Sequence, residues 1–263
     1  MRLVFKRTIT RVSDTGLMAR KQLAGLQGHH AYSSFRYADI VNVPSRVDWR
    51  ERGAVTQVRL QGNNLCCWAF AAVAAVESLI KLRTNSLIEL SSQQLIDCNI
   101  QNYGSEMGWP HKAFKYIMRN GVTTAAEYPY RGPRGKCCYT RSNYIIAKIK
   151  NYEFVPQYNE RALLKAVAHQ PVCVSITTPP SFLTYTGGIL LGHTVPKVYC
   201  MTELTHVVTV IGYGTENGTK YWLLKNSWGR HWGSNGFAKD GFVHEVLSTF
   251  EDVVQYNILD FRR

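Results

Sequence analysis

Four residues of this chain have the types and the spacing of a nucleophilic site. Cys67 lies at the start of a long apolar segment, where the unpaired N–H groups and the dipole of a helix would favour a thiolate. Gln61 precedes it on a Gly-Asn loop, so its amide could stabilise an oxyanion formed beside Cys67. His206 and Asn226 follow in the second half of the chain. A thiol, an imidazole base and an amide that holds the imidazole are the components of covalent catalysis.

The nucleophile depends on a predicted helix. Residues 66–82 are rich in alanine and leucine and are apolar nearly all round, which predicts a helix buried at the centre of the molecule. Asn64, just ahead of this segment, is a good N-cap. Further helices are predicted at 91–97, 111–119 and 160–169. The first half of the chain is therefore expected to be mostly helical.

The base and its partner depend on a predicted β-hairpin. Strand-like segments occupy residues 206–213 and 220–225, and an Asn-Gly pair lies between them; this pair is the strongest short hairpin signal. His206 opens the first segment, and Asn226 follows the second. At matching ends of one hairpin, the asparagine carbonyl can hold the imidazole in one tautomer. A helical part followed by a β part, with the site between them, is an α+β architecture.

Composition and charge limit the alternatives. The chain has 263 residues, of which 45% are hydrophobic and 19% charged, and this composition excludes global disorder. The longest apolar run, 66–76, is about half the length of a membrane-spanning helix, so no membrane partner is expected. The formal charge is +13, but nine Lys/Arg against three Asp/Glu place +6 of it in residues 1–50. Because no recognition-helix, RRM or zinc-finger pattern accompanies the charge, no nucleic acid is expected.

The cysteines favour disulfides over a metal site. There are seven, two pairs of them adjacent in sequence, and no C-x-x-C spacing occurs, which is a poor arrangement for tetrahedral zinc. We therefore expect no metal and no cofactor. Distant single cysteines such as Cys98 suit an oxidising compartment. The N-terminus is basic, but no apolar core of signal-peptide length follows it, so no signal peptide is visible.

Several sequence blocks, in one order, resemble the papain-like cysteine proteases. In chain order, the blocks are Asp48-Trp-Arg, Gln61-Gly62, Cys67-Trp-Ala-Phe, Leu90 to Cys98, Glu127-Tyr-Pro-Tyr, Thr205-His-Val-Val-Thr-Val-Ile-Gly and Asn226-Ser-Trp-Gly. The resemblance runs from about Pro44 to Phe237. Ser33-Ser-Phe-Arg-Tyr, ahead of it, is most similar to plant vacuolar or senescence-type members.

The resemblance implies a role for each site residue. Cys67 would be the nucleophile of a cysteine endopeptidase, His206 its base and acid, and Asn226 the residue that orients His206. Gln61 and the Cys67 N–H would form the oxyanion hole. The residues implied in supporting roles are Trp228 as a shield of the His206–Asn226 hydrogen bond, Gly108, Trp109, Pro110 and Val207 in substrate binding, and Cys98 in a disulfide with Cys137 or its neighbour Cys138.

The resemblance also implies a two-domain α+β fold with the active site in the cleft between the domains. We expect a basic, flexible leader at 1–42, a helical domain at 43–150 that carries the nucleophile, and an antiparallel β-barrel-like domain at 151–237 that carries the histidine and asparagine. Residues 238–263 do not resemble the family's final strand and are expected to form a divergent tail. The implied enzyme is a monomer of the vacuole, lysosome or extracellular space that acts in protein catabolism. Its implied partners are protein or peptide substrates and cystatin-type inhibitors.

Departures from the family pattern leave a second hypothesis open. Leu65 and Met107 replace glycines of the cleft, where close approach or positive φ is needed. Asn64 and Ser105 replace both cysteines of one family disulfide. The alternative is therefore a papain-fold pseudoenzyme or binding module with impaired catalysis. The presence of all four catalytic positions favours the active enzyme.

Overall fold

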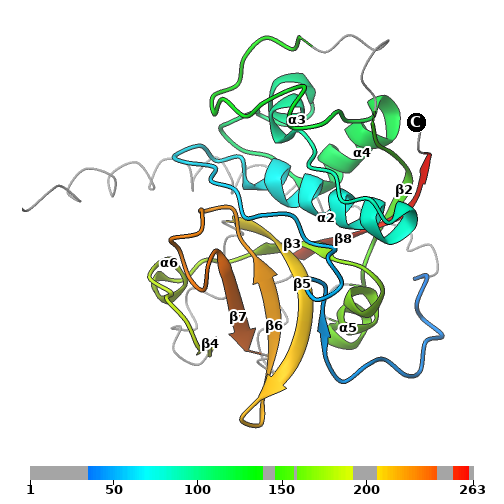
Figure 1. Ribbon diagram of the computed structural model, residues 1–263, viewed down its shortest axis with the longest axis vertical. Coiled ribbons are helices and arrows are strands. Elements are labelled where there is room, and N and C mark those ends of the chain that lie inside the picture. Colours follow the sequence, from blue (N-terminus) through cyan, green and yellow to red (C-terminus); the bar gives the residue numbers. More distant parts are fainter. Residues whose placement is uncertain (1–34, 139–145, 157–158, 192–205, 242–250, 261–263) are drawn as a thin grey trace, which may run out of the picture.

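The computed structural model describes residues 35–138, 146–156, 159–191, 206–241 and 251–260. The long helix α2 (Cys67–Thr84) crosses the middle of the molecule, between two other helices on one side and most of the strands on the other (Figure 1). α3 (Ser92–Cys98) and α4 (Pro110–Asn120) lie beside α2, whereas α5 (Glu160–His169) and α6 (Pro180–Leu183) lie beside the strands. The mixture of helix and sheet confirms the predicted α+β class.

Helix α2 is buried because its sequence offers no polar face. Every residue from Cys67 to Ile80 is buried, and the basic side chains Lys81 and Arg83 come only in the last turn, where they complement the helix dipole. The predicted helix is confirmed to within two residues. The predicted N-cap is wrong: Cys66 occupies that position without a side-chain hydrogen bond. Asn64 instead donates to the Gln61 carbonyl at 3.2 Å.

The strands form one sheet in the order β2-β8-β3-β5-β6-β7-β4, and β1 pairs with β5. Their bounds are β1 (Val47–Asp48), β2 (Lys148–Phe154), β3 (Val172–Ile176), β4 (Ile189–Leu190), β5 (His206–Glu216), β6 (Thr219–Lys225), β7 (Phe237–Gly241) and β8 (Glu251–Asp260). The predicted hairpin is the β5–β6 pair, closed by Asn217 at φ 50° and Gly218 at φ 78°. Positive φ at both central residues is what a tight hairpin turn of this kind requires.

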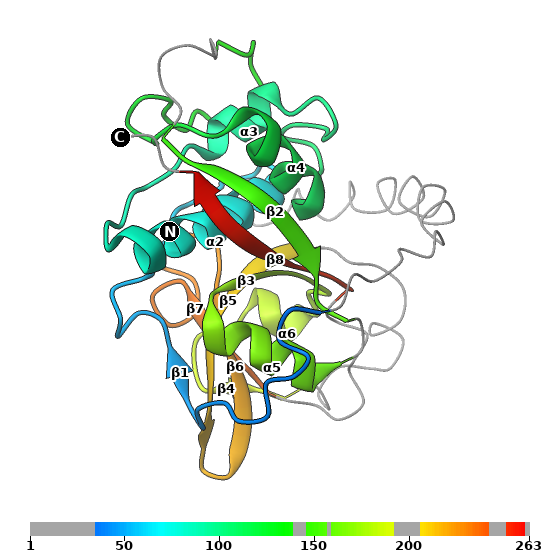
Figure 2. The ribbon, with the colours of Figure 1, turned by 90° about the vertical axis from the view of Figure 1, so that its right-hand side faces the viewer.

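Two described parts of the predicted divergent tail, residues 238–241 and 251–260, belong to the sheet. β7 pairs with β6, and β8 lies between β2 and β3 (Figure 2). The register joins Tyr152 to Tyr256 and Cys173 to Val254. The chain end therefore supplies a strand from within the sheet, although its sequence lies beyond the family resemblance.

Strands also lie near the other predicted domain boundaries. β1, in the segment predicted as helical, pairs with β5, and residue 150 falls inside β2. Of the predicted flexible leader, residues 1–34 lie outside the described residues. Its described end packs on α5: the Tyr37 ring stacks on His169 with 4.2 Å between centroids, and Lys165 Nζ donates to the Ala38 carbonyl at 2.6 Å.

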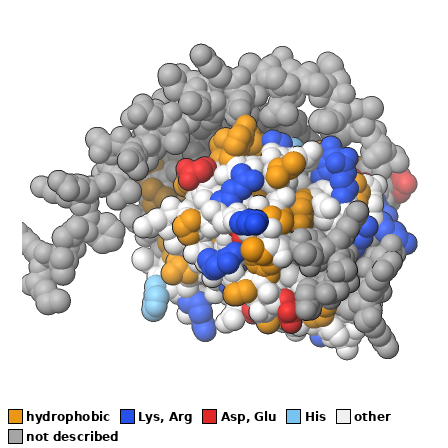
Figure 3. All heavy atoms as spheres, turned by 90° about the horizontal axis from the view of Figure 1, so that it is seen from above, with side chains coloured by type: hydrophobic (Ala, Val, Ile, Leu, Met, Phe, Trp, Pro, Cys, Tyr) orange, Lys and Arg blue, Asp and Glu red, His pale blue; other side chains and the backbone are white. Residues whose placement is uncertain are grey.

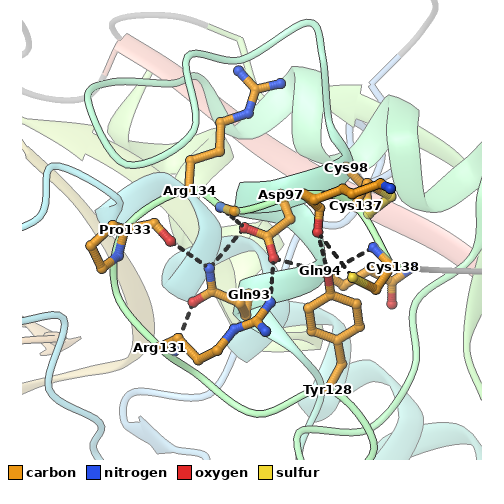
Figure 4. A network of polar contacts seen from close by, with 12 residues as sticks. Gln93, Gln94, Asp97, Cys98, Tyr128, Arg131, Pro133, Arg134, Cys137 and Cys138 are labelled. Atoms are coloured by element: carbon orange, nitrogen blue, oxygen red, sulfur yellow. Dashed lines mark hydrogen bonds and ion pairs between the residues drawn. A yellow bond between two sulfur atoms is a disulfide. The ribbon is translucent and has the colours of Figure 1, made fainter.

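A buried carboxylate holds the loop 128–138 against α3. The Asp97 side chain is 0% exposed and accepts four hydrogen bonds of 2.7–2.9 Å, which come from Gln93 Nε2, Tyr128 Oη, Arg131 Nη2 and the Gly135 N–H (Figure 4). Gln93 belongs to α3, and the other three donors belong to the loop. Because an unpaired charge would be costly in this interior, these hydrogen bonds fix the loop to the helix.

The same loop carries the disulfide. Cys98 is bonded to Cys137, and the neighbouring Cys138 is an exposed free thiol. The absent family disulfide would join positions 64 and 105. Next to Asn64, the Leu65 N–H donates to the Ser105 carbonyl at 2.7 Å. A backbone hydrogen bond therefore joins the two segments there. Cys200 lies outside the described residues.

Basic side chains on the α3 side of the molecule are separated by apolar and uncharged surface (Figure 3). The formal charge of the whole chain is +13. Among the described residues, no helix combines the length and the apolar character that a membrane span needs.

Candidate active site

The first turn of α2 places Cys67 against the start of β5. Cys67 is the first residue of the helix and is 9% exposed. The backbone of Val207 hydrogen-bonds to its sulfur. The thiol therefore lies beside the start of β5, where Val207 follows His206.

Burial opposes ionisation of this thiol. Removal from water raises the pKa of Cys67 to about 12, against the smaller effect of backbone hydrogen bonds from Val207 and Trp68. The sequence predicted that the helix N-terminus and an imidazole partner would favour the thiolate; in the structure, loss of hydration is the largest effect on the pKa of Cys67 and opposes the thiolate. A thiolate therefore forms here when a base within the site accepts the proton.

His206 and Asn226 meet at the end of the β5–β6 hairpin. The register joins Thr209 to Lys225, so both residues lie at the same edge, and His206 Nε2 is 2.7 Å from Asn226 Oδ1. The Ser227 N–H also donates to Asn226 Oδ1, at 2.7 Å, which identifies that atom as the amide oxygen. An amide oxygen only accepts, so Nε2 carries the proton and Nδ1 is left as the acceptor.

Burial also keeps this imidazole neutral. It lowers the pKa of His206 to about 4, although the hydrogen bond with Asn226 acts in the opposite direction. At neutral pH the imidazole is therefore in the form that can accept a proton. The thiol of Cys67 and the imidazole of His206 are therefore both buried in their neutral forms.

An aromatic cluster covers the imidazole. The Trp228 ring is 4.5 Å from the His206 ring, between centroids, at 32°. Phe182 is 5.7 Å from Trp228 and 5.0 Å from Trp232. Apolar rings around a hydrogen bond exclude water that would compete for its donor and acceptor. Phe182 and Trp232 were not predicted, because nothing in their local sequence points toward His206.

The Gln61 amide is held in one orientation by Ser227. The Ser227 hydroxyl donates to Gln61 Oε1 at 2.6 Å, and the Gln61 N–H donates to the Ser227 carbonyl at 2.8 Å. Gln61 Nε2 donates to the Asn64 carbonyl at 2.6 Å. A primary amide has two N–H donors, so a second one remains for an oxyanion. Ser227 was missed, although it lies inside the Asn-Ser-Trp-Gly motif.

Tyr130 braces the loop that carries Gln61. Its hydroxyl donates to the Gln61 carbonyl at 2.6 Å and accepts from Asn64 Nδ2 at 3.2 Å. The Cys66 sulfur lies 3.4 Å from the same oxygen. The sequence showed Tyr130 as part of a family block but gave it no role, because the contact spans 69 residues.

The predicted substrate-binding residues lie on both sides of Cys67. A side chain at Gly108 would come within 2.6 Å of the Trp68 indole, so only glycine lets this segment approach the helix so closely. Trp109 and Pro110 follow at the start of α4, with the Trp109 N–H bonded to Asn102 Oδ1 at 2.8 Å. Val207 lies on the β side, beside the thiol.

Leu65 occupies the cleft rim without backbone strain. Leu65 is 53% exposed and lies two positions before Cys67 in the sequence. Among described non-glycine residues, left-handed φ occurs only at Asn85, Asn217 and Asn235. Leu65 is not among them, so of the two alternatives, close approach and positive φ, only close approach applies at this position.

Known proteins match most of the chain. Residues 43–243 match the model described as "Papain family cysteine protease". The chain is 45% identical over 208 residues to the KDEL-tailed cysteine endopeptidase CEP2 of Arabidopsis thaliana, with 78% of this chain and 56% of that protein covered. It is 47% identical over 214 residues to the senescence-specific cysteine protease SAG39 of Oryza sativa subsp. indica, with 79% of this chain and 61% of that protein covered. The chain thus spans little more than half the length of these two relatives.

A solved structure shows the same fold. The bromelain protease from Ananas comosus, in complex with the E64 inhibitor, superposes with a TM-score of 0.74 and 39% identity. The match covers 82% of this chain and 100% of that one.

Proposed function

The chain belongs to the papain family of cysteine proteases, and we propose on this basis that it is a cysteine-type endopeptidase. The single observation that carries the proposal is the buried His206–Asn226 hydrogen bond of 2.7 Å, at the hairpin end that meets Cys67. This arrangement presents Nδ1 of a neutral imidazole as a base next to a thiol at a helix N-terminus.

In the acylation step, His206 acts first as a base and then as an acid. The Cys67 Sγ proton passes to His206 Nδ1, and the sulfur lone pair forms a bond to the carbonyl carbon of the scissile peptide. The carbonyl electron pair moves to oxygen, where the free N–H of Gln61 Nε2 and the Cys67 backbone N–H stabilise the charge. When the pair returns, the C–N bond breaks, and His206 gives its proton to the leaving amine.

Deacylation repeats the chemistry with water. His206 takes a proton from water, which attacks the thioester carbonyl, and the C–S bond breaks as the proton returns to sulfur. The free acid leaves and the thiol is restored. Asn226 keeps the imidazole plane fixed through both halves, with Trp228 and Phe182 covering its hydrogen bond.

The setting of this activity is part of the proposal. Protein or peptide substrates, inhibition by cystatin-type proteins, a monomeric state and a vacuolar, lysosomal or extracellular location all rest on family membership. The Cys98–Cys137 disulfide supports an oxidising compartment. The chain's similarity to relatives named as senescence-specific and KDEL-tailed proteases supports a role in protein catabolism.

Adjacent cysteines provide a matched test. The wild-type protein, Cys67→Ala and Cys66→Ala are compared for hydrolysis of a fluorogenic peptide and for labelling by an epoxide that alkylates activated thiols. Both thiols are buried neighbours, so loss of activity and labelling in Cys67→Ala alone supports the endopeptidase. Absence of labelling in folded wild-type protein would support a binding module instead.

A further inference from the structure

The β5–β6 hairpin ends in a turn that projects from the molecule. Asn217 and Gly218 form this turn, with φ of 50° and 78°, and the residues from Thr215 to Gly218 are exposed. A Cβ atom at Gly218 would have no heavy atom within 4 Å beyond its chain neighbours. The turn lies at the end of the molecule opposite α3 and α4 (Figure 1). The space around it is therefore open.

The same turn contains a modification motif that the proposed mechanism does not use. Asn217-Gly218-Thr219 has the Asn-x-Ser/Thr pattern of an N-glycosylation acceptor, and it is the only such sequence in the chain. A tight hairpin turn favours asparagine and glycine because both tolerate positive φ, but it does not require a hydroxyl at the next residue. Neither the Asn217 amide nor the Thr219 hydroxyl makes a hydrogen bond to another described residue. The fold therefore leaves both polar groups available.

The motif is far from the proposed active site. The 11 residues of β5 lead from His206 to the turn, which corresponds to about 30 Å along a strand. Glu216 pairs with Thr219 beside the turn, whereas Asn226 follows β6 at the other end of the hairpin. A bulky group on Asn217 would therefore leave the site around Cys67 uncovered.

We propose that Asn217 carries an N-linked oligosaccharide. Nδ2 of Asn217 would attack the first sugar carbon of a lipid-linked oligosaccharide pyrophosphate. The N–C bond forms, the C–O bond to pyrophosphate breaks, the amide loses one proton to the transferase, and the lipid pyrophosphate leaves. The Cys98–Cys137 disulfide supports passage through the endoplasmic reticulum, whose lumen is oxidising. The proposal rests on the proposed location of the protein and is independent of its protease activity.

The test follows the mass of the full chain after secretion from a eukaryotic host. A cleavable secretion signal ahead of Met1 delivers the chain, so the result does not depend on the proposed location. A glycosidase that cleaves the sugar–asparagine bond, used in heavy-oxygen water, converts each glycosylated asparagine to an aspartate with one heavy oxygen. We expect this mark at Asn217. Thr219→Val keeps the Asn-Gly turn and should abolish the glycan, whereas Thr219→Ser should retain it.

Asn235 is the matched internal control. It is exposed, has φ of 55° and precedes Gly236, but Phe237 stands where a hydroxyl residue would be needed. Asn235 should therefore stay without a glycan. Spontaneous deamidation of Asn-Gly pairs would affect both asparagines and would need no glycosidase, so it is distinguished from glycan release. An unglycosylated Asn217 in the secreted, folded chain would overturn the proposal, as would a glycan that persists in Thr219→Val.

Discussion

Removal of the Tyr130 hydroxyl should slow turnover by loosening the loop that carries Gln61. Tyr130→Phe keeps the edge contact with Phe70, whose ring centroid is 4.9 Å away, but loses the hydrogen bonds to Gln61 and Asn64. At about 1 kcal/mol for each neutral hydrogen bond, the free energy of unfolding should fall by about 2 kcal/mol. A 1 Å misplacement can cost about a hundredfold in rate, so a partial shift of Gln61 should lower kcat about tenfold.

Tyr128 provides the matched control, two residues away. Its hydroxyl donates to Asp97 at 2.8 Å, and a hydrogen bond to a charged group contributes about 2 kcal/mol. Tyr128→Phe should therefore lose similar stability while kcat is unchanged. Urea unfolding gives the stability of each variant, and a fluorogenic dipeptide gives kcat and KM. If both variants lower kcat equally, or if Tyr130→Phe leaves it unchanged, the bracing role is refuted.

Three further predictions concern the site. Asn226→Ala should lower kcat with the fold intact, as measured by steady-state kinetics and circular dichroism; a change in KM alone would contradict its orienting role. Leu65→Gly should raise kcat/KM on one dipeptide more than Met107→Gly does, because it removes an exposed side chain two residues before Cys67; equal values would exclude this steric effect. The pKa of His206 falls from 6.5 in the unfolded chain to about 4 in the fold, so the unfolded chain binds the extra proton between these values. The free energy of unfolding should therefore drop by about 3 kcal/mol as pH falls from 6.5 to 4, and denaturation of His206→Gln should lack this dependence.

Local signals in the sequence predicted the elements that carry the site. The alanine-rich run without a polar face indicated the buried helix α2, and the Asn217-Gly218 turn indicated the hairpin. Hairpin geometry then placed His206 and Asn226 at one edge, because antiparallel register follows from the turn. These predictions needed only contacts between residues close in sequence.

Contacts between distant segments were beyond this reasoning. Tyr130 and Ser227 act on Gln61 from 69 and 166 residues away, and no period or spacing in the sequence reports such pairs. The Val, Tyr, Ile and Leu content of 253–259 is a strand signal. That signal does not tell which strands β8 pairs with, and in the structure β8 lies between β2 and β3. Burial of Cys67, which reverses the expected pKa shift, likewise depends on packing of the whole molecule.

The central claim is that Cys67 reacts through proton transfer to His206 within a buried pair. The direct test is the rate of Cys67 alkylation by an epoxide against pH, in the wild type and in His206→Ala. We expect the wild-type rate to persist at mildly acidic pH and to fall only toward pH 4, where His206 becomes protonated. The variant should react only in alkaline solution, because burial raises the pKa of Cys67 toward 12. A wild-type rate that rises only near the free-cysteine pKa of about 8.5, or identical profiles for the two proteins, would contradict the claim.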